Sequence, residues 1–367
     1  MNKYLILALG LILTTVACND DNKQNIDSGN FDRAIMLTNY ADNLIIPSYT
    51  ALLTKVDVLK HNINLMIKPE STAEQLLQVR EAWFEVAQQW QFCNSYNFGP
   101  AGEMGIKKGL NEEIATFPIA ETKLINFINA NDTAFANFDR DTRGIYAIEY
   151  LLYTPGLSNN QILDSIKNNT NKINYLNALI GNVRKNVGDV VTQWSAYRGN
   201  FMSNKGTDIG SSTSMLYNEF LKSYEGLKNY KFGIPLGRRP GQTEPLPQQV
   251  EAYYSGISTS LAKLHWQSVK QIWEGMAANG ADGPGFKEYL QNVPGGNDLI
   301  SLTQTQVAAV DAKLNLLPAT KLSDAISQQF NVVDDVHTEL QKTTRFFKSD
   351  MSSLLGIAIT YSSGDGD

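Results

Sequence analysis

The sequence predicts an all-α protein made of two helical-bundle-like halves. From residue 31 onward, apolar residues recur at three- and four-residue steps, which is the spacing of one helix face. No stretch alternates apolar and polar residues for long enough to argue for a β-sheet. A chain of 367 residues exceeds what one hydrophobic core usually holds. The two halves also carry similar sets of predicted helices, a pattern that fits an internal duplication of bundles.

The composition excludes several classes of protein. The net charge of -6 and the lack of any Lys/Arg-dense stretch argue against nucleic acid as a partner. The two cysteines, Cys18 and Cys93, offer no disulfide framework. The three histidines, His61, His265 and His337, are widely separated and form no HExxH motif, which argues against a zinc site with several histidine ligands.

The first 30 residues are expected to direct export and anchoring rather than to fold. Residues 1–17 have a charged start and a short apolar core, as in a secretory signal peptide. Their end, followed by Cys18, resembles a bacterial lipoprotein signal, so we expect Cys18 to carry lipid and to anchor the protein to a membrane. The alternative is an ordinary signal peptide with a chance cysteine. Residues 18–30 are a polar, flexible tether, and the acidic pair within it resembles export signals of Bacteroidetes surface lipoproteins.

The N-terminal bundle is expected to span residues 31–198. Its predicted helices cover residues 35–60, with a kink or split at Pro47, and residues 71–90, opened by a capping box from Ser71 to Glu74. Further helices are predicted at 111–127, 143–153 and 171–197. The C-terminal bundle is expected to span residues 199–367, beginning with a polar loop at 199–214. Its predicted helices are residues 215–227, 250–279, 286–290, 307–317 and 326–354.

The helix at residues 143–153 is the best pointer to function. Its apolar residues predict burial, yet Glu149 lies in its middle with no basic residue within one helical turn. Tyr146 stands three positions earlier, so the phenol and the carboxylate share a face. Because a buried carboxylate is costly unless it is paired, hydrogen-bonded or metal-bound, Glu149 is either a binding residue or a structural one that caps backbone groups or pairs with Arg143 or another arginine. Asp141 or Thr142 is expected to cap the start of this helix.

Several stretches together resemble the imelysin-like family, also called the M75 peptidase family. They occur in family order at residues 44–49, 80–83, 98–100, 143–152, 230–237, 254–258 and 364–367. The resemblance implies an all-helical fold of two bundle-like halves. It also implies an envelope protein associated with bacterial iron acquisition, often a lipoprotein, here an outer-membrane lipoprotein facing the periplasm or the cell surface.

The family's proposed functional motif, Gly-x-His-x-x-Glu, matches residues 144–149 at Gly144 and Glu149, but Tyr146 replaces the histidine. Phenolate is a good ligand for a hard cation such as ferric iron, whereas it does not replace a neutral imidazole as a zinc ligand or base. The resemblance therefore makes Glu149 and Tyr146 candidate metal ligands, with an iron or other metal ion as the cofactor. Arg143 would balance charge, and Gly144 would allow close helix approach.

The leading hypothesis is a non-enzymatic, lipid-anchored protein that binds iron, an iron complex or a partner in iron uptake. The alternatives are an M75-type metallopeptidase, weakened by Tyr146, and a structural partner of an outer-membrane iron-uptake receptor. Ser255 and Ser258 are not expected to be nucleophiles, since His265 lies two helical turns beyond Ser258. His265 and His337 are expected to be partly exposed.

Overall fold

The computed structural model describes residues 31–103, 109–136 and 138–361, and all regular structure within these ranges is helical. The predicted all-α class is therefore confirmed. No helix in these ranges is both long enough and apolar enough to cross a membrane. The predicted signal peptide, the tether with Cys18 and the acidic C-terminal end lie outside the described residues.

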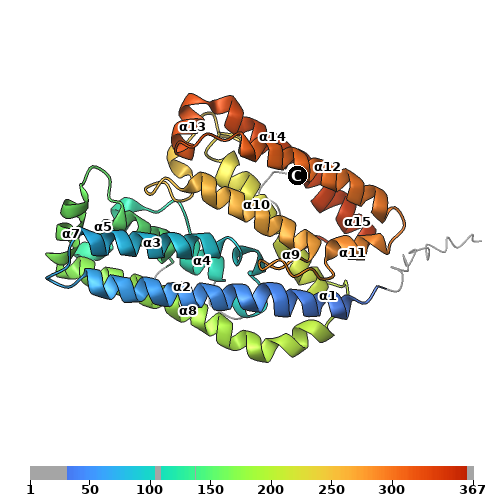
Figure 1. Cartoon of the computed structure of the whole chain (residues 1–367), viewed down its shortest axis with the longest axis horizontal. Coiled ribbons are helices and arrows are strands. Elements are labelled where there is room, and N and C mark those ends of the chain that lie inside the picture. Colours follow the sequence, from blue (N-terminus) through green and yellow to red (C-terminus); the bar gives the residue numbers. More distant parts are fainter. Residues whose placement is uncertain (1–30, 104–108, 137, 362–367) are drawn as a thin grey trace, which may run out of the picture.

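The N-terminal half forms the lower layer in Figure 1. Helix α2 packs against both α3 and α8, and α6 lies in contact with α3, α4 and α8. The long α8 thus spans most of this half and supports the buried α6. The elements of this half are α1 (Arg33–Asn39), a π-helical segment (Tyr40–Ile45), α2 (Ile46–Met66), α3 (Ala73–Trp90), α4 (Leu110–Ala115), α5 (Glu121–Asn129), α6 (Gly144–Leu152), α7 (Asn159–Lys167) and α8 (Thr170–Ser203).

The C-terminal half forms the upper layer, with α9 and α10 nearest the N-terminal half (Figure 1). Helix α9 contacts α1 and the short helix Asn94–Tyr96, and α10 contacts α3, so these helices build the junction between the layers. The elements are α9 (Ser212–Glu225), a π-helical segment (Gly226–Gly233), α10 (Ser258–Glu274), α11 (Phe286–Gln291), α12 (Gly296–Asn315), α13 (Leu322–Gln328), α14 (Phe330–Thr344), a second π-helical segment (Arg345–Met351) and α15 (Ser352–Leu355).

Several predicted element boundaries differ from the structure. The capping box of α3 is formed by Thr72 and Gln75, one residue later than predicted, because the Ser71 hydroxyl instead donates to the carbonyl of Lys68 at 2.8 Å. The run through Pro47 stays helical: the chain passes through π geometry at residues 40–45, and Pro47 follows in the first turn of α2.

The two largest differences lie near the junction of the halves. Helix α8 continues to Ser203, so the predicted polar loop shortens to residues 204–211. Helix α10 begins at Ser258 rather than at 250, because residues 251–256 form turns in which Ala252 and Gly256 have φ of 52° and 77°. This turn segment, residues 250–257, lies against α6 and carries two residues of the candidate site.

Candidate functional site

Helix α6 holds three of the predicted site residues, Gly144, Tyr146 and Glu149, and all nine residues of the helix are buried. Gly144 has a φ of 83°, and a Cβ atom there would lie 2.3 Å from the carbonyl oxygen of Ile114 in α4. The close helix approach predicted for Gly144 is therefore present. The predicted cap is wrong: Arg143 is the N-cap residue and its side chain makes no capping bond, while the Thr142 hydroxyl donates to the Asp139 carbonyl at 2.7 Å.

Glu149 is hydrogen-bonded to the turn segment of the C-terminal half. Its Oε1 accepts bonds from the backbone N–H of Ser255 at 2.8 Å and from the Ser255 hydroxyl at 2.7 Å. Burial raises the pKa of Glu149 to about 7, against the opposing effect of the Ser255 bonds. The Glu149 carboxylate therefore accepts a backbone and a side-chain donor of Ser255 across the junction of the halves. This contact fits the alternative in which Glu149 is a structural residue that caps backbone groups.

Tyr146 does not bond to Glu149 but to a second glutamate. Its hydroxyl donates to Oε1 of Glu251, and Gln91 Nε2 donates to the same oxygen at 3.2 Å. Lys231 Nζ lies 2.7 Å from Oε2 of Glu251 and donates to Gln91 Oε1 at 2.5 Å. Burial, and next Glu251, raise the pKa of Tyr146 well above its usual value, so the phenol stays protonated.

This network continues to a serine and a histidine. Asn94 Nδ2 donates to Gln91 Oε1 at 3.3 Å, and the Ser223 hydroxyl donates to Asn94 Oδ1 at 3.0 Å. Ser223 Oγ also lies 2.7 Å from Nε2 of His265. His265 is buried, so the prediction of partial exposure is wrong: α10 packs against α9, and the imidazole faces that contact. His337 is half-buried, as predicted.

The Ser223–His265 pair does not complete a catalytic triad. His265 Nδ1 has no hydrogen-bond partner among the described residues, so no carboxylate orients the ring. Burial, and next the charge of Lys231, lower the pKa of His265 well below its usual value, which weakens it as a base. The hydroxyls of Ser255 and Ser258 donate to the Glu149 carboxylate and to the Glu251 carbonyl, respectively.

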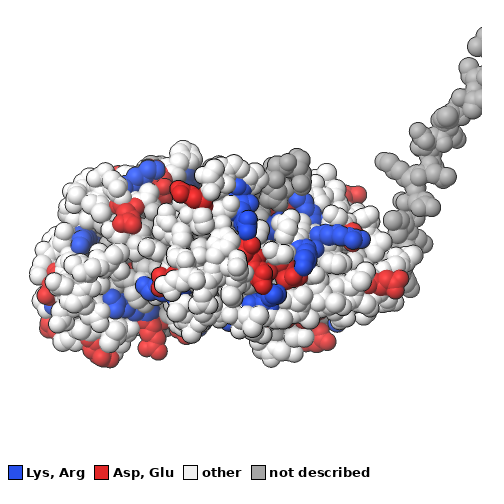
Figure 2. Space-filling model, turned by 90° about the horizontal axis from the view of Figure 1, so that it is seen from above, with Lys and Arg blue, Asp and Glu red and all other residues white. Residues whose placement is uncertain are grey.

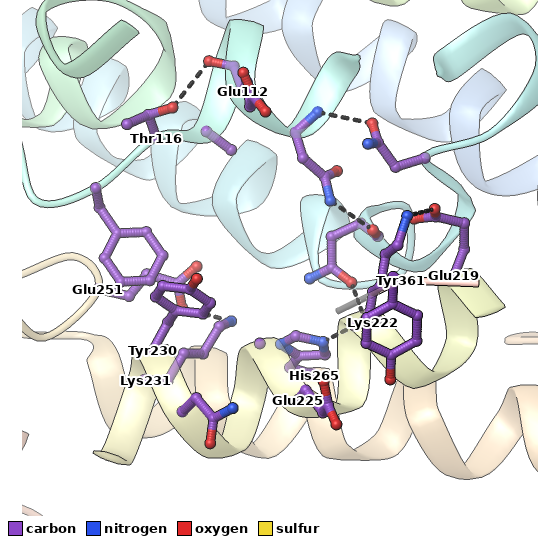
Figure 3. Close-up of a pocket in the computed structure, with 18 of the residues that line it drawn as sticks. Glu112, Thr116, Glu219, Lys222, Glu225, Tyr230, Lys231, Glu251, His265 and Tyr361 are labelled. Carbon is purple, nitrogen blue, oxygen red and sulfur yellow. Dashed lines mark hydrogen bonds and ion pairs between the residues drawn. The ribbon is translucent and has the colours of Figure 1, made fainter. Parts of the chain in front are cut away.

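A cavity of about 1060 Å³ lies between the two halves, and part of this network forms its wall. Lys231, Glu251 and His265 come from the C-terminal half, and Glu112 and Thr116 lie opposite on the N-terminal half (Figure 3). Tyr146 and Glu149 do not line the cavity, although Tyr146 bonds to Glu251, which does. Aromatic residues also contribute, namely Trp90, Phe98, Phe117, Tyr230 and Tyr361. On the face of the molecule seen from above, acidic and basic side chains are mixed near the middle (Figure 2).

Arg143 points to a different partner from the one predicted. Its Nη2 lies 2.9 Å from Oε2 of Glu113, whose Oε1 lies 2.9 Å from Nη2 of Arg140. Arg143 therefore does not balance the charge of Glu149. Glu149 bonds instead to Ser255 of the C-terminal half.

The described residues do not present a ready metal site. No three His, Cys, Asp or Glu side chains within the described ranges are grouped so that they could hold a metal ion. Glu149 and Tyr146, the predicted metal ligands, are already bonded to different residues of the C-terminal half, Ser255 and Glu251. A bare metal ion therefore does not fit these residues in the present arrangement.

The sequence interpretation missed most of the network, although two signals pointed to it. Lys231 and Ser255 lie inside stretches that resemble the family, residues 230–237 and 254–258. Gln91, Asn94, Ser223, Glu251 and His265 had no comparable signal, since each is an ordinary polar residue in its local sequence.

Comparisons with known proteins agree with this architecture. The model of the imelysin family, peptidase M75, matches residues 45–343. Iron-regulated protein A of Synechococcus elongatus is 22% identical over 266 residues, covering 69% of this chain and 67% of that protein.

Two solved structures share the fold. An imelysin-like protein of Psychrobacter arcticum matches with a TM-score of 0.69 at 19% identity, and an iron-regulated protein A precursor of Parabacteroides distasonis with 0.67 at 17%. Each match covers 90% of this chain and 97% of the other. Since the family match extends over most of the chain and the helical layers correspond, the chain belongs to the imelysin family.

Proposed function

We propose that this chain is a lipid-anchored envelope protein that binds an iron complex in the cavity between its halves, as part of bacterial iron uptake. The cavity is the observation that carries the proposal. Its volume of about 1060 Å³ suits a small-molecule ligand, and both halves contribute to its wall, an arrangement typical of ligand sites. The names of two relatives connect them with iron regulation.

An iron complex fits the cavity better than a bare iron ion. A bare ion needs several protein ligands, and no three acidic, histidine or cysteine side chains of the described chain converge on one point. Tyr146 and Lys231 are already bonded to Glu251. A complexed ion brings its own ligands, so the protein has only to recognise the organic part.

Tyr230 is the side chain best placed for that recognition. It lines the cavity and is 52% exposed, so its ring is accessible for stacking on a flat ligand. Phe117, from the N-terminal half, lines the same cavity and is half-buried. The proposed ligand therefore contacts both halves.

The family's peptidase name makes a metallopeptidase the alternative. Such an enzyme needs three protein ligands and an open metal position, and the described residues do not offer that set. A third role, as a structural partner of an outer-membrane iron-uptake receptor, requires no small ligand at all.

Thermal unfolding of the chain from residue 19 onward tests these roles. We expect ferric citrate, a ferric hydroxamate or haem to raise the Tm, whereas free ferric, ferrous and zinc ions do not. A ligand at about 100 times its Kd adds roughly 2.7 kcal/mol to the free energy of unfolding. Tyr230→Ala should weaken binding, and Tyr253→Ala, an exposed tyrosine outside the cavity wall, should not.

The result can also contradict the proposal. Stabilisation by a free ion alone would favour direct metal binding, and zinc-dependent cleavage of a peptide would favour the metallopeptidase. If no complex binds, the structural role with a receptor becomes the better hypothesis. The anchor is tested separately: full-length protein should fractionate with membranes, and Cys18→Ser should release it.

A further inference from the structure

A second cavity lies at the start of α6, away from the cavity between the halves. Its volume is about 140 Å³, and the two cavities share no lining residue. Two arginines, one glutamate and two asparagines dominate its wall, namely Arg140, Arg143, Glu113, Asn182 and Asn186. It is large enough for a small ion or a short organic acid.

One carboxylate serves both guanidinium groups in this wall. Arg140 donates to Oε1 of Glu113 from Nε at 3.2 Å and from Nη2 at 2.9 Å, while Arg143 Nη2 lies 2.9 Å from Oε2. The three side chains are only 9%, 4% and 9% exposed for Arg140, Arg143 and Glu113. The titratable residues of the wall therefore carry a formal net charge of +1, and a buried charge without a partner is costly.

Two further carboxylates of this region, Asp139 and Asp141, pair with a lysine outside the cavity. Asp139 and Asp141 are about a third exposed, do not line the cavity, and pair with Lys123 at 2.8 Å and 3.5 Å. Burial is the largest influence on the pKa of Arg143 and lowers it, although Glu113 acts in the opposite direction. The arrangement therefore favours an additional negative charge beside Arg143.

Two hydrogen-bond donors in the wall lack acceptors. Arg143 Nε is buried and has no partner among the described residues. In the same wall, Asn182 Oδ1 accepts a bond from the Asn186 amide at 3.1 Å, while the Asn182 amide nitrogen donates to no atom of the described chain. A guanidinium edge and a carboxamide N–H are donors that suit an oxyanion.

We propose that this cavity is a binding site for a small oxyanion, a carboxylate or a phosphate, held by Arg143, Arg140 and Asn182. The anion would accept bonds from Arg143 Nε and from the Asn182 amide and would balance the second guanidinium. The sequence predicted that Arg143 would balance charge beside Glu149; its side chain lines this separate cavity instead. The proposal does not depend on the iron-complex function.

The test compares two aspartate substitutions on α8. Asn182→Asp puts a fixed carboxylate at the wall of the cavity. Asn177→Asp is the matched control, since Asn177 is also half-buried on α8, lines neither cavity and makes no side-chain hydrogen bond in the described chain. The Tm of the chain from residue 19 onward is measured during titrations with formate and with phosphate at constant ionic strength. The ¹H–¹⁵N resonance of Arg143 Nε is followed in the same titrations.

We expect a saturable rise in Tm and a shift of the Arg143 Nε resonance for the wild type and for Asn177→Asp. For Asn182→Asp we expect both responses to be lost. A response to formate alone would identify a carboxylate site, and a response to phosphate alone a phosphate site; a response to both assigns a general oxyanion site. No saturable response of the wild type to either anion, or an unchanged response in Asn182→Asp, would overturn the proposal.

Discussion

Glu149 and Ser255 connect the two halves through a single carboxylate oxygen. Glu149 Oε1 accepts the backbone N–H of Ser255 at 2.8 Å and its hydroxyl at 2.7 Å, although the residues are 106 positions apart in the chain. Glu251, in the same turn segment, accepts the Tyr146 hydroxyl of α6. The turn segment, residues 250–257, is therefore bonded to α6 at two points. Glu251 also lines the cavity, so it joins the hydrogen-bond network to the cavity wall.

Stability should fall as pH rises because of Glu149. Its folded pKa of about 7 exceeds the ordinary value of 4.5, so the folded state binds this proton more tightly than the unfolded state does. The contribution is fully present below about pH 4.5 and is lost as pH rises through about 7. The difference between these two pKa values corresponds to about 3 kcal/mol in the free energy of unfolding. Urea unfolding at pH 5 and pH 8 measures it, and Glu149→Gln, which does not ionise, should show a smaller loss.

Glu81→Gln is the control for this experiment, because Glu81 is an exposed carboxylate in α3. It should retain the wild-type loss of stability between the two pH values. An equal loss in Glu149→Gln and in the wild type would show that other groups cause the pH dependence.

Removing the Tyr146 hydroxyl should destabilise the junction of the halves. Tyr146→Phe deletes the bond to the Glu251 carboxylate, and bonds to charged groups contribute about 1.5–3 kcal/mol. Tyr49→Phe is the comparison, since the Tyr49 hydroxyl is also buried but donates to the neutral carbonyls of Cys93 and Tyr96 at 3.3 Å and 3.1 Å. We expect it to cost about 1 kcal/mol in urea unfolding. A smaller loss for Tyr146→Phe than for Tyr49→Phe would contradict the assigned bond.

Local sequence was sufficient for the helices and for the burial of α6. The apolar run around Ile145 and Leu152 predicted a buried helix, and both residues are fully buried. The same periodicity failed at residues 250–257, where apolar and small residues continue the helical spacing but the backbone turns. The glycine at position 256 was the sequence signal for a turn, because glycine readily adopts positive φ angles; in the structure its φ is 77°.

The partners of the site residues could not be predicted in the same way. Helical spacing correctly put Tyr146 and Glu149 on one face, but it carries no information about which residues of the other half lie opposite. Those partners, Glu251 and Ser255, are separated from α6 by about a hundred residues. Arg143 illustrates the same limit: it was expected to balance charge in the motif with Glu149, whereas packing brings it to Glu113.

Gly144 should tolerate no side chain. Its φ of 83° is unfavourable for other residues, and an added Cβ would lie 2.3 Å from the backbone oxygen of Ile114. Gly156→Ala is a matched control, because Gly156 has a φ of 77° but no atom within 4 Å of an added Cβ. We expect Gly156→Ala to cost about 1–2 kcal/mol from backbone strain alone. Gly144→Ala should cost more, by urea unfolding or by loss of folded protein; equal costs would show that α4 moves away freely.

Tyr146→His tests what the tyrosine changes in the motif. An imidazole at this position would lie near two carboxylates, since Glu251 accepts the Tyr146 hydroxyl and the charge of Glu149 raises the pKa of Tyr146. One imidazole and two carboxylates are a ligand set that zinc accepts. We expect calorimetric titration to show zinc binding at least about tenfold tighter than in Tyr146→Phe, a difference of about 1.4 kcal/mol. Lys231 competes for Glu251, so the gain should increase in the double variant with Lys231→Met. Equal zinc affinity in the His and Phe variants would show that the two carboxylates do not converge on position 146.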